Sequence, residues 1–244
     1  MVPREWLREM IGIVAAHSQE LKPFEQVLTQ RRKENGVTMG QIDGVEVMLK
    51  SIGQGFAQAE RAVNAFLDHF HPDVLVMTGF AGATKPELGA GDFLVPEKVL
   101  DLRKSTAGNG GSSYNIPLQT EALRRSIGAQ SGSLGTVEEI LVEPNRKQAA
   151  GDQSDVAAVD LESAAVASVA QRRKVPWLVV RVVLDPMDQR LDVTSAAQMA
   201  YLVVSLVGWG RAIRFWKNFS AARGSLEGAV HQIVAAAKDG QVLS

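Results

Sequence analysis

The segment from 158 to 188, AVDLESAAVASVAQRRKVPWLVVRVVLDPMD, constrains the fold of this chain more than any other stretch. Its part from Val175 to Leu184 is almost wholly apolar and β-branched, which is typical of a strand buried on both faces of a parallel sheet. Arg181 interrupts this run and Asp185 ends it. The small residues around Glu162 predict a helix that starts there and lies close to the sheet. Because ligands of open α/β sheets bind outside the carboxyl ends of the strands, Glu162 and Asp185 are expected to share one pocket.

Strand and helix patterns alternate along the rest of the chain. Strands are expected at 10–16 and 72–78, a further strand is expected to start at 92–95, and 131–140 is expected to be a strand that leads into a site loop. A strand pair with an Asp43-Gly44 turn is expected at 36–52, and helices from Ser18 and after the glycine-rich turn at 51–55. Residues 103–116 are polar and glycine-rich and predict a flexible loop. The chain is therefore predicted to be α/β: a single three-layer α/β/α domain over 1–244, with a central, mostly parallel mixed sheet and a C-terminal amphipathic helical segment at about 195–238.

Composition excludes several classes of function. The 26 Lys and Arg residues balance 27 Asp and Glu residues, which argues against a general nucleic-acid binder. The absence of cysteine excludes disulfides and thiolate metal sites, and the four histidines show no metal-ligand spacing. No signal-peptide pattern or bilayer-spanning stretch is present, so a cytoplasmic protein without a bound metal is expected.

Acidic and glycine residues at predicted strand ends are the candidates for chemistry. Glu20 falls in the opening turn of a helix just after the first strand, where the alternative interpretation is an acid favoured by the helix dipole. The turn at 51–55 could present backbone N–H groups to an anion or a hydroxyl. Gly79 and Gly82 allow close approach of the backbone, although a tight turn without a ligand explains them equally well.

Five motifs, in this order, resemble the nucleoside phosphorylase / nucleosidase superfamily, and especially its methylthioadenosine/S-adenosylhomocysteine nucleosidase branch. They are IGIVAAHSQEL, KSIGQG, PDVLVMTGFAGA with LGAGDFLVP, VDLESAAVA and VPWLVVRVVLD, and they run from about Met10 to Asp188. Each motif alone is weak, whereas five in the right order are specific. The resemblance implies an enzyme that cleaves the N-glycosidic bond of a purine nucleoside.

The resemblance also implies roles for individual residues. Glu20 matches the acid that activates the attacking water, and Asp185 matches the general acid that protonates N7 of the departing purine. Glu162 matches the carboxylate that holds the ribose hydroxyls. The remaining expected substrate-binding residues are Leu161 (where a methionine often packs under the sugar), Arg181 (a supporting residue), Phe80, Gly79, Ile140 and Gly53.

The chemistry of bond cleavage agrees with these roles. Positive charge builds on the sugar and negative charge on the leaving base, so a carboxylate by the sugar and a proton donor at the base both lower the barrier. Asp185 must hold a proton in order to donate it. Its apolar neighbours Val183, Leu184, Pro186 and Met187 are expected to raise its pKa by desolvation.

Departures from the family pattern leave three functions open. Leu184 and Phe80 stand where the family often has serine, and Val76-Met77-Thr78 stand where phosphorylases place a phosphate-binding arginine. Together with Glu20, this favours water as the nucleophile, with no cofactor. The first alternative is a phosphorylase that uses phosphate as co-substrate, bound by Arg103, Lys104 or the turn at 51–55. The second is an inactive relative that binds a nucleoside or a lipid.

The C-terminal segment is the second informative region. A helical wheel places Trp209, Ala212, Ile213, Phe215, Trp216 and Phe219 on one face, and Arg211, Arg214, Lys217 and Asn218 on the other. This pattern is that of a membrane-surface helix at 209–223, and the alternative is a helix packed on the core or in a dimer interface. It resembles the hopanoid-associated phosphorylases, which act on an adenosyl group attached to a polyterpenoid lipid. The resemblance further implies a homodimer in which 103–116 reaches the neighbouring subunit.

Overall fold

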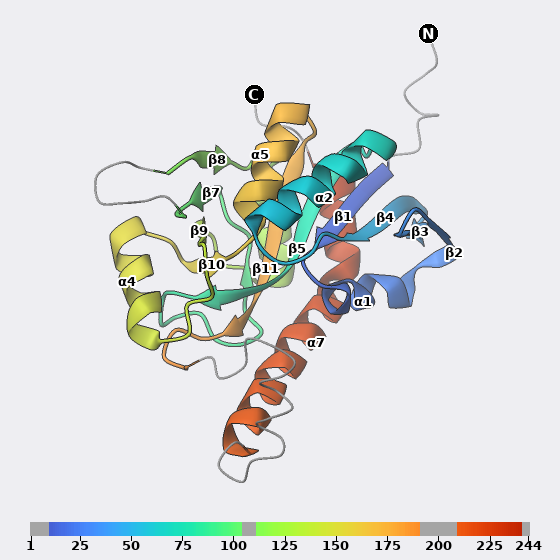
Figure 1. Cartoon of the computed structure of the whole chain (residues 1–244). Coiled ribbons are helices and arrows are strands. Elements are labelled where there is room, and N and C mark those ends of the chain that lie inside the picture. Colours follow the sequence, from blue (N-terminus) through green and yellow to red (C-terminus); the bar gives the residue numbers. More distant parts are fainter. Residues whose placement is uncertain (1–9, 104–110, 191–208, 241–244) are drawn as a thin grey trace.

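A computed structural model describes residues 10–103, 111–190 and 209–240. The chain is built around one mixed 11-stranded sheet (Figure 1). At its centre β4 (Val45–Ser51), β1 (Met10–Ala15), β5 (Val74–Ala83) and β11 (Trp177–Asp185) run parallel in that order. Their carboxyl ends therefore point to the same edge of the sheet, which is where ligands of α/β sheets bind.

The first edge of the sheet is antiparallel. β3 (Val37–Ile42) pairs with β4 across the predicted turn, where Asp43 and Gly44 both have positive φ (52° and 79°), as a two-residue hairpin of type I′ requires. β2 (Thr29–Glu34) extends this edge and is exposed throughout. The sequence analysis did not predict β2, because TQRRKE has neither apolar residues nor alternation.

The second half of the sheet consists of short strands. β5 continues into an antiparallel pair with β10 (Ala158–Asp160), and β10, β9 (Ser133–Thr136) and β7 (Lys98–Asp101) run parallel. β6 (Phe93–Leu94) pairs with β11, and β8 (Ser113–Asn115) pairs with β7. The prediction of a loop at 103–116 is therefore wrong for 113–115, because edge pairing with β7 orders these polar residues, while 104–110 lie outside the described residues.

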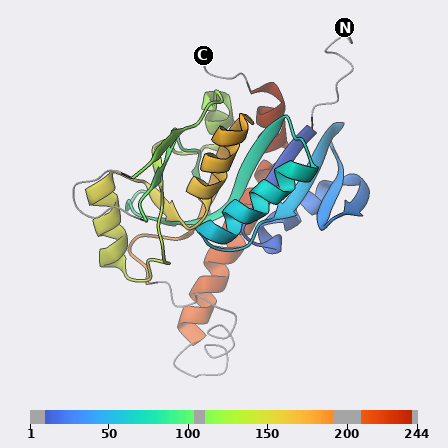
Figure 2. The same ribbon diagram turned by 45° about the horizontal axis from the view of Figure 1, so that its top comes forward.

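Helices cover both faces of the sheet, as predicted for a three-layer fold (Figures 1 and 2). α2 (Phe56–His69) and α5 (Ser163–Arg173) pack side by side on one face. α1 (Ser18–Val27), α3 (Glu121–Ile127) and α7 (Trp209–Asp239) lie on the other. α4 (Pro144–Ser154) lies at the periphery near β9 and β10.

The central segment folds with three differences from its prediction. The predicted strand is β11, which begins at Trp177 rather than Val175 and includes Asp185, and the alanines of α5 are buried as expected of a helix close to the sheet. However, the short strand β10 precedes α5, and Glu162 is the N-cap of this helix rather than a member of its first turn. β10 ends at Asp160, so Glu162 follows the carboxyl end of β10, just as Asp185 stands at the carboxyl end of β11.

The long helix α7 has two different halves. Its C-terminal half is buried against the sheet through Ala222, Leu226, Ala229, Val230, Ile233, Val234 and Ala237. Its N-terminal half extends beyond the body of the domain (Figures 1 and 2). There Ile213 and Trp216 are each 53% exposed. Among the helices in the described part of the chain, none combines the length and apolarity needed to cross a bilayer.

Candidate active site

The three predicted acids, together with Asp160, line one cavity at the carboxyl ends of the central strands. Glu20 comes from the first turn of α1 after β1, Glu162 from the N-cap of α5, and Asp185 from the end of β11. Their exposed fractions are 4%, 5% and 6%. Most other lining residues are apolar: Ala16, Phe80, Ala81, Val137, Ile140, Leu141, Val159, Leu161 and Leu184. The structure thus brings together acids that lie more than 160 positions apart in the chain.

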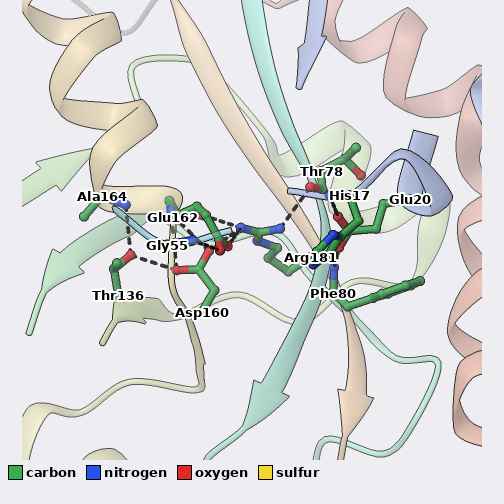
Figure 3. Close-up of polar contacts among 11 residues, drawn as sticks. His17, Glu20, Gly55, Thr78, Phe80, Thr136, Asp160, Glu162, Ala164 and Arg181 are labelled. Atoms are coloured by element: carbon green, nitrogen blue, oxygen red, sulfur yellow. Dashed lines mark hydrogen bonds and ion pairs between the residues drawn. The ribbon is translucent and has the colours of Figure 1, made fainter. Parts of the chain in front are cut away.

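Both oxygens of Glu20 accept backbone hydrogen bonds. His17 N–H donates to Oε2 at 2.7 Å and Phe80 N–H donates to Oε1 at 2.8 Å (Figure 3). The first bond serves the N-terminus of α1, so the helix-end interpretation of this acid applies alongside its position in the cavity. Two fixed donors orient the carboxylate and stabilise its negative charge.

Gly79 allows the contact between Glu20 and β5. Its φ is +128°, and a Cβ at this position would lie 2.4 Å from Glu20 Oε1 and 2.8 Å from Arg181 Nη1. The left-handed region and the lack of space both require glycine here. Gly79 does not line the cavity itself, because it lies behind Glu20.

Glu162 is held by the glycine-rich turn and by a buried arginine. Gly55 N–H donates to Oε1 at 2.8 Å, and Arg181 Nη2 lies 3.8 Å from Oε2. Burial, with a further contribution from the negative charge of Asp160, raises the pKa of Glu162 to about 7. The turn at 51–55 therefore presents a backbone N–H to a protein carboxylate rather than to a ligand.

Arg181 and Asp160 form the buried support beneath this carboxylate (Figure 3). Arg181 is fully buried and donates to Thr78 O at 2.9 Å, to Ser163 Oγ at 3.1 Å and to Asp160 Oδ2. Burial alone would lower the pKa of Arg181, but the charges of Asp160, Glu162 and Glu20 raise it overall. The guanidinium is thus a fixed positive charge behind the acids.

Asp160 also organises the start of α5. Thr136 Oγ1 donates to Asp160 Oδ1 at 2.8 Å, and Ser163 N–H donates to both carboxylate oxygens at 3.2 Å. Ala164 N–H donates to Thr136 Oγ1 at 2.9 Å. These bonds satisfy the first N–H groups of the helix and so fix the N-cap, Glu162.

Asp185 has a charged partner in addition to the apolar neighbours that the sequence predicts. Leu184 lines the cavity and Val183 is buried beside it, but Lys147 Nζ of α4 lies 2.5 Å from Asp185 Oδ2. Lys147 is itself 1% exposed. A cation at this distance stabilises the ionised carboxylate and opposes the effect of desolvation. The sequence analysis missed this partner, since α4 has a polar sequence without an apolar stripe.

The other predicted residues divide between the cavity wall and its support. Phe80, Leu161 and Ile140 line the cavity, whereas Arg181 supports it from behind. Gly53 lies in the wall of a separate hollow with Ser51 and Gln58, and Gln54 lines the main cavity instead. Asp160, Lys147 and His17 complete the polar surroundings and were not predicted, although the acid in VDLES offered a signal for Asp160.

The candidate phosphate ligands are engaged elsewhere or undescribed. Arg103 donates from Nε and Nη2 to Asp101 at 2.9 and 2.7 Å, and its guanidinium lies 3.1 Å from the centre of the Phe56 ring. Lys104 lies outside the described residues. Within 10–103, 111–190 and 209–240, no group of three or more His, Asp or Glu side chains could hold a metal ion. The described residues that line the cavity offer the chemistry of carboxylic acids in largely apolar surroundings.

Fold and site together define a class: a three-layer α/β/α protein with a small-molecule cavity walled by acids at the strand ends. The Phosphorylase superfamily model matches residues 10–206, and the chain belongs to this superfamily.

Relatives and solved structures agree with this assignment. The chain is 27% identical over 192 residues to the 5'-methylthioadenosine/S-adenosylhomocysteine nucleosidase of Geobacillus kaustophilus, an alignment that covers 69% of this chain and 82% of the relative. The nucleosidase of Bacillus thuringiensis is 26% identical, with coverage of 79% and 96%. In fold, the chain is similar to the futalosine hydrolase of Helicobacter pylori (TM-score 0.72, 16% identity, coverage of 93% and 98%). It is also similar to the nucleosidase of Neisseria meningitidis in complex with methylthio-immucillin-A (TM-score 0.72, 18% identity, coverage of 93% and 99%).

Proposed function

We propose that this protein is a nucleosidase that hydrolyses the N-glycosidic bond of an adenine-type nucleoside and releases the free base. The observation that supports this most is the meeting of Glu20, Glu162 and Asp185 in one largely apolar cavity. The two relatives described above, both 5'-methylthioadenosine/S-adenosylhomocysteine nucleosidases, support adenine as the base.

Each acid has a distinct part in the proposed reaction. Glu162, ionised, accepts hydrogen bonds from the ribose hydroxyls and stabilises the positive charge that develops on the sugar. Asp185 transfers a proton to the departing base, so that the base leaves as a neutral molecule. Glu20, oriented by two backbone N–H groups, accepts a proton from the water that attacks C1′. The apolar walls strengthen all three interactions because they exclude bulk water.

Water is the nucleophile that the surroundings of Glu20 favour. A phosphorylase requires a cationic or N–H-rich site for phosphate beside the sugar. Arg103 is one candidate from the sequence, and its guanidinium is already engaged by Asp101 and the Phe56 ring. Hydrolysis needs no cofactor. Phosphorolysis, with phosphate as co-substrate, remains the alternative that the first experiment separates.

Base release from a panel of adenosine compounds, with and without phosphate, tests the proposal. We expect release of adenine without phosphate, and a loss of at least about 100-fold in kcat in Asp185→Asn and in Glu20→Gln. A strict requirement for phosphate would replace the nucleosidase with a phosphorylase and remove the role of Glu20. Tight binding of adenosine compounds without turnover would indicate an inactive relative. A surface acid without contacts to the cavity, such as Glu139, provides the matched control as Glu139→Gln.

We further propose that the substrate carries an apolar 5′ group on its ribose. Phe80 lines the cavity and packs edge-on against Phe219 of α7, with ring centres 5.6 Å apart. Phe219 in turn packs against Phe215 and Trp216. An aromatic path thus runs from the cavity to the exposed half of α7, which supports contact between residues 209–223 and an anionic membrane surface.

We also propose that the protein forms a homodimer, on the basis of the superfamily resemblance. Arg103, at the start of the 103–116 segment, lies in a hollow that shares Gln54 and Val137 with the cavity wall. This segment therefore begins beside the cavity, where it could contact the site of a neighbouring copy. The mass of the protein in solution, measured alongside the base-release assay, distinguishes a monomer from a dimer.

A further inference from the structure

Lys147 is a buried lysine with no role in the reaction described so far. Only Lys147 and Gly151, one turn apart, are buried among the residues of α4. The Lys147 ammonium group lies 2.5 Å from Asp185 Oδ2, 3.0 Å from Pro186 O and 2.6 Å from Gln189 O. An ammonium group has three N–H donors, so these three acceptors satisfy it completely.

Burial of this charge is costly unless its partners are well placed. Removing an ammonium group from water costs several kcal/mol, and one carboxylate with two carbonyl oxygens compensates for this. The contacts hold the end of β11 and the 186–189 turn against α4. Among them, Asp185 is the partner that also lines the cavity.

The residue before Asp185 cannot orient its carboxyl group. Position 184 is Leu, whose side chain has no hydrogen-bond donor and lines the cavity. Lys147 contacts Oδ2 directly from the neighbouring helix. Lys147 therefore supplies, from a position 38 residues earlier in the chain, a polar contact that the side chain at position 184 cannot make.

We propose that Lys147 is a positioning residue for Asp185: it fixes the orientation of the carboxyl group, and its charge stabilises the carboxylate that remains after proton transfer. The inference rests on the proposed function. In that step the Asp185 O–H bond breaks and an N–H bond forms on the base. The C1′–N bond breaks with its electron pair on the base, while water bonds to C1′ and gives its proton to Glu20.

Loss of the Lys147 charge is expected to change the pH dependence of proton donation by Asp185. A neighbouring cation makes the carboxyl group release its proton at lower pH. Among the described residues, the other titratable or charged groups that face the cavity are His17 and Glu20 at the start of α1, Glu162 at the start of α5 and Asp160 of β10, with Arg181 behind them. All of these groups remain in the Lys147→Met variant. A shift of the alkaline limb in its pH profile of kcat is therefore due to the loss of the Lys147 charge.

The pH profiles of kcat and kcat/KM in the wild-type protein, Lys147→Met and Lys147→Arg test the inference. We expect K147M to lower the plateau of kcat by about tenfold and to move its alkaline limb upward by about one pH unit. K147R retains the charge and should keep the limb near its wild-type position. Lys85→Met is the matched control, because Lys85 forms an ion pair with Asp155 that is exposed to solvent.

The results distinguish a Lys147 that positions Asp185 from a Lys147 that only supports the fold. A K147M enzyme with reduced activity and an unmoved limb would overturn the inference while leaving the nucleosidase intact. Absence of base release by the wild-type protein would overturn both. If K147M does not fold, Lys147→Gln gives the same test, since its amide can still donate to Pro186 O and Gln189 O. In an Asp185→Asn background, K147M should cause little further loss of kcat, whereas a structural role predicts the full tenfold loss.

Discussion

Gly79 carries no side chain, yet two charged groups of the site depend on it. Its positive φ turns β5 so that the next N–H, that of Phe80, reaches Glu20. The same position leaves room for the Arg181 guanidinium, which no Cβ would allow. A single backbone conformation thus places the proposed base and the buried cation at once.

Gly79→Ala should therefore damage the site more than the fold. The added methyl group must displace the Glu20 carboxylate, so we expect kcat/KM to fall by about 100-fold. The strained φ and the contacts together should cost about 2–4 kcal/mol of unfolding free energy. Chemical denaturation and steady-state kinetics measure the two effects.

Gly44→Ala is the matched control for Gly79→Ala. Gly44 also has a positive φ, of 79°, but a Cβ there would meet nothing within 4 Å. Gly44→Ala should lower the free energy of unfolding by about 1 kcal/mol and leave kcat/KM unchanged. Equal losses of activity in both variants would show that backbone strain, not the contact with Glu20, is responsible.

At the scale of elements, the sequence predicts best what is buried and periodic. β1, β5, β11 and α2 each show an apolar run or stripe, and the Asp43-Gly44 turn has the residues that its φ values require. β2 and α4 were missed because their residues are mostly polar: β2 is exposed and is ordered by pairing with β3, and α4 has no apolar stripe. β10 was missed because it has only three residues.

These missed elements carry the parts of the site that could not be predicted. Glu20 and Asp185 follow or end strands that the hydrophobic pattern reveals, and Glu162 begins a helix that its small residues predict. The family resemblance assigns the roles of all three acids. Lys147 and Asp160 belong to α4 and β10, so no local pattern connects them with those acids. The partner of a buried charge depends on packing between distant segments, which is a property of the folded chain.

The exposed half of α7 gives a prediction for this element. Ile213 and Trp216 are half exposed, and Arg214 and Lys217 are exposed on the same two turns. Apolar rings beside basic side chains bind anionic bilayers through burial and charge together. The wild-type protein should sediment with anionic vesicles more than with zwitterionic ones, and the double variant Ile213→Ser/Trp216→Ser should bind at least tenfold less.

A matched control distinguishes vesicle binding by this face of α7 from non-specific binding by any exposed apolar side chain. Val27, 36% exposed on α1, is another exposed apolar residue, and Val27→Ser should bind vesicles like the wild type. Turnover of a soluble nucleoside should be equal in all three proteins. If vesicles do not bind and the double variant instead dissociates a dimer, a second copy of the chain covers this face.

For the whole molecule, the site concentrates unfavourable charge inside the domain. Glu20, Asp160 and Glu162 are buried around one guanidinium, that of Arg181. Glu162 has the weaker compensation, with one backbone hydrogen bond and an arginine at 3.8 Å. The buried Glu162 carboxylate therefore lowers the free energy of unfolding while it remains available to bind a sugar, and such a loss of stability is common at functional sites.

Stability should consequently fall as pH rises through the titration of Glu162. Its pKa is raised from 4.5 to about 7 in the folded protein, so between these values the folded state binds more protons than the unfolded state. The unfolding free energy then decreases with pH from about 4.5 to about 7 and loses at most about 3 kcal/mol through this group. Below 4.5 the contribution of the protonated group is fully present.

Denaturant unfolding of Glu162→Gln at several pH values measures this effect. The amide cannot ionise and its oxygen can still accept from Gly55 N–H, so E162Q should match the wild type at pH 4 and exceed its stability at pH 8. Glu121→Gln provides the opposite control, because hydrogen bonds from Arg125 and Arg124 lower the pKa of exposed Glu121. That variant should be slightly less stable than the wild type at pH 8. If E162Q were less stable than the wild type at pH 8, the ionised Glu162 would be a stabilising group, and the cavity would not be strained by the charge that its proposed function requires.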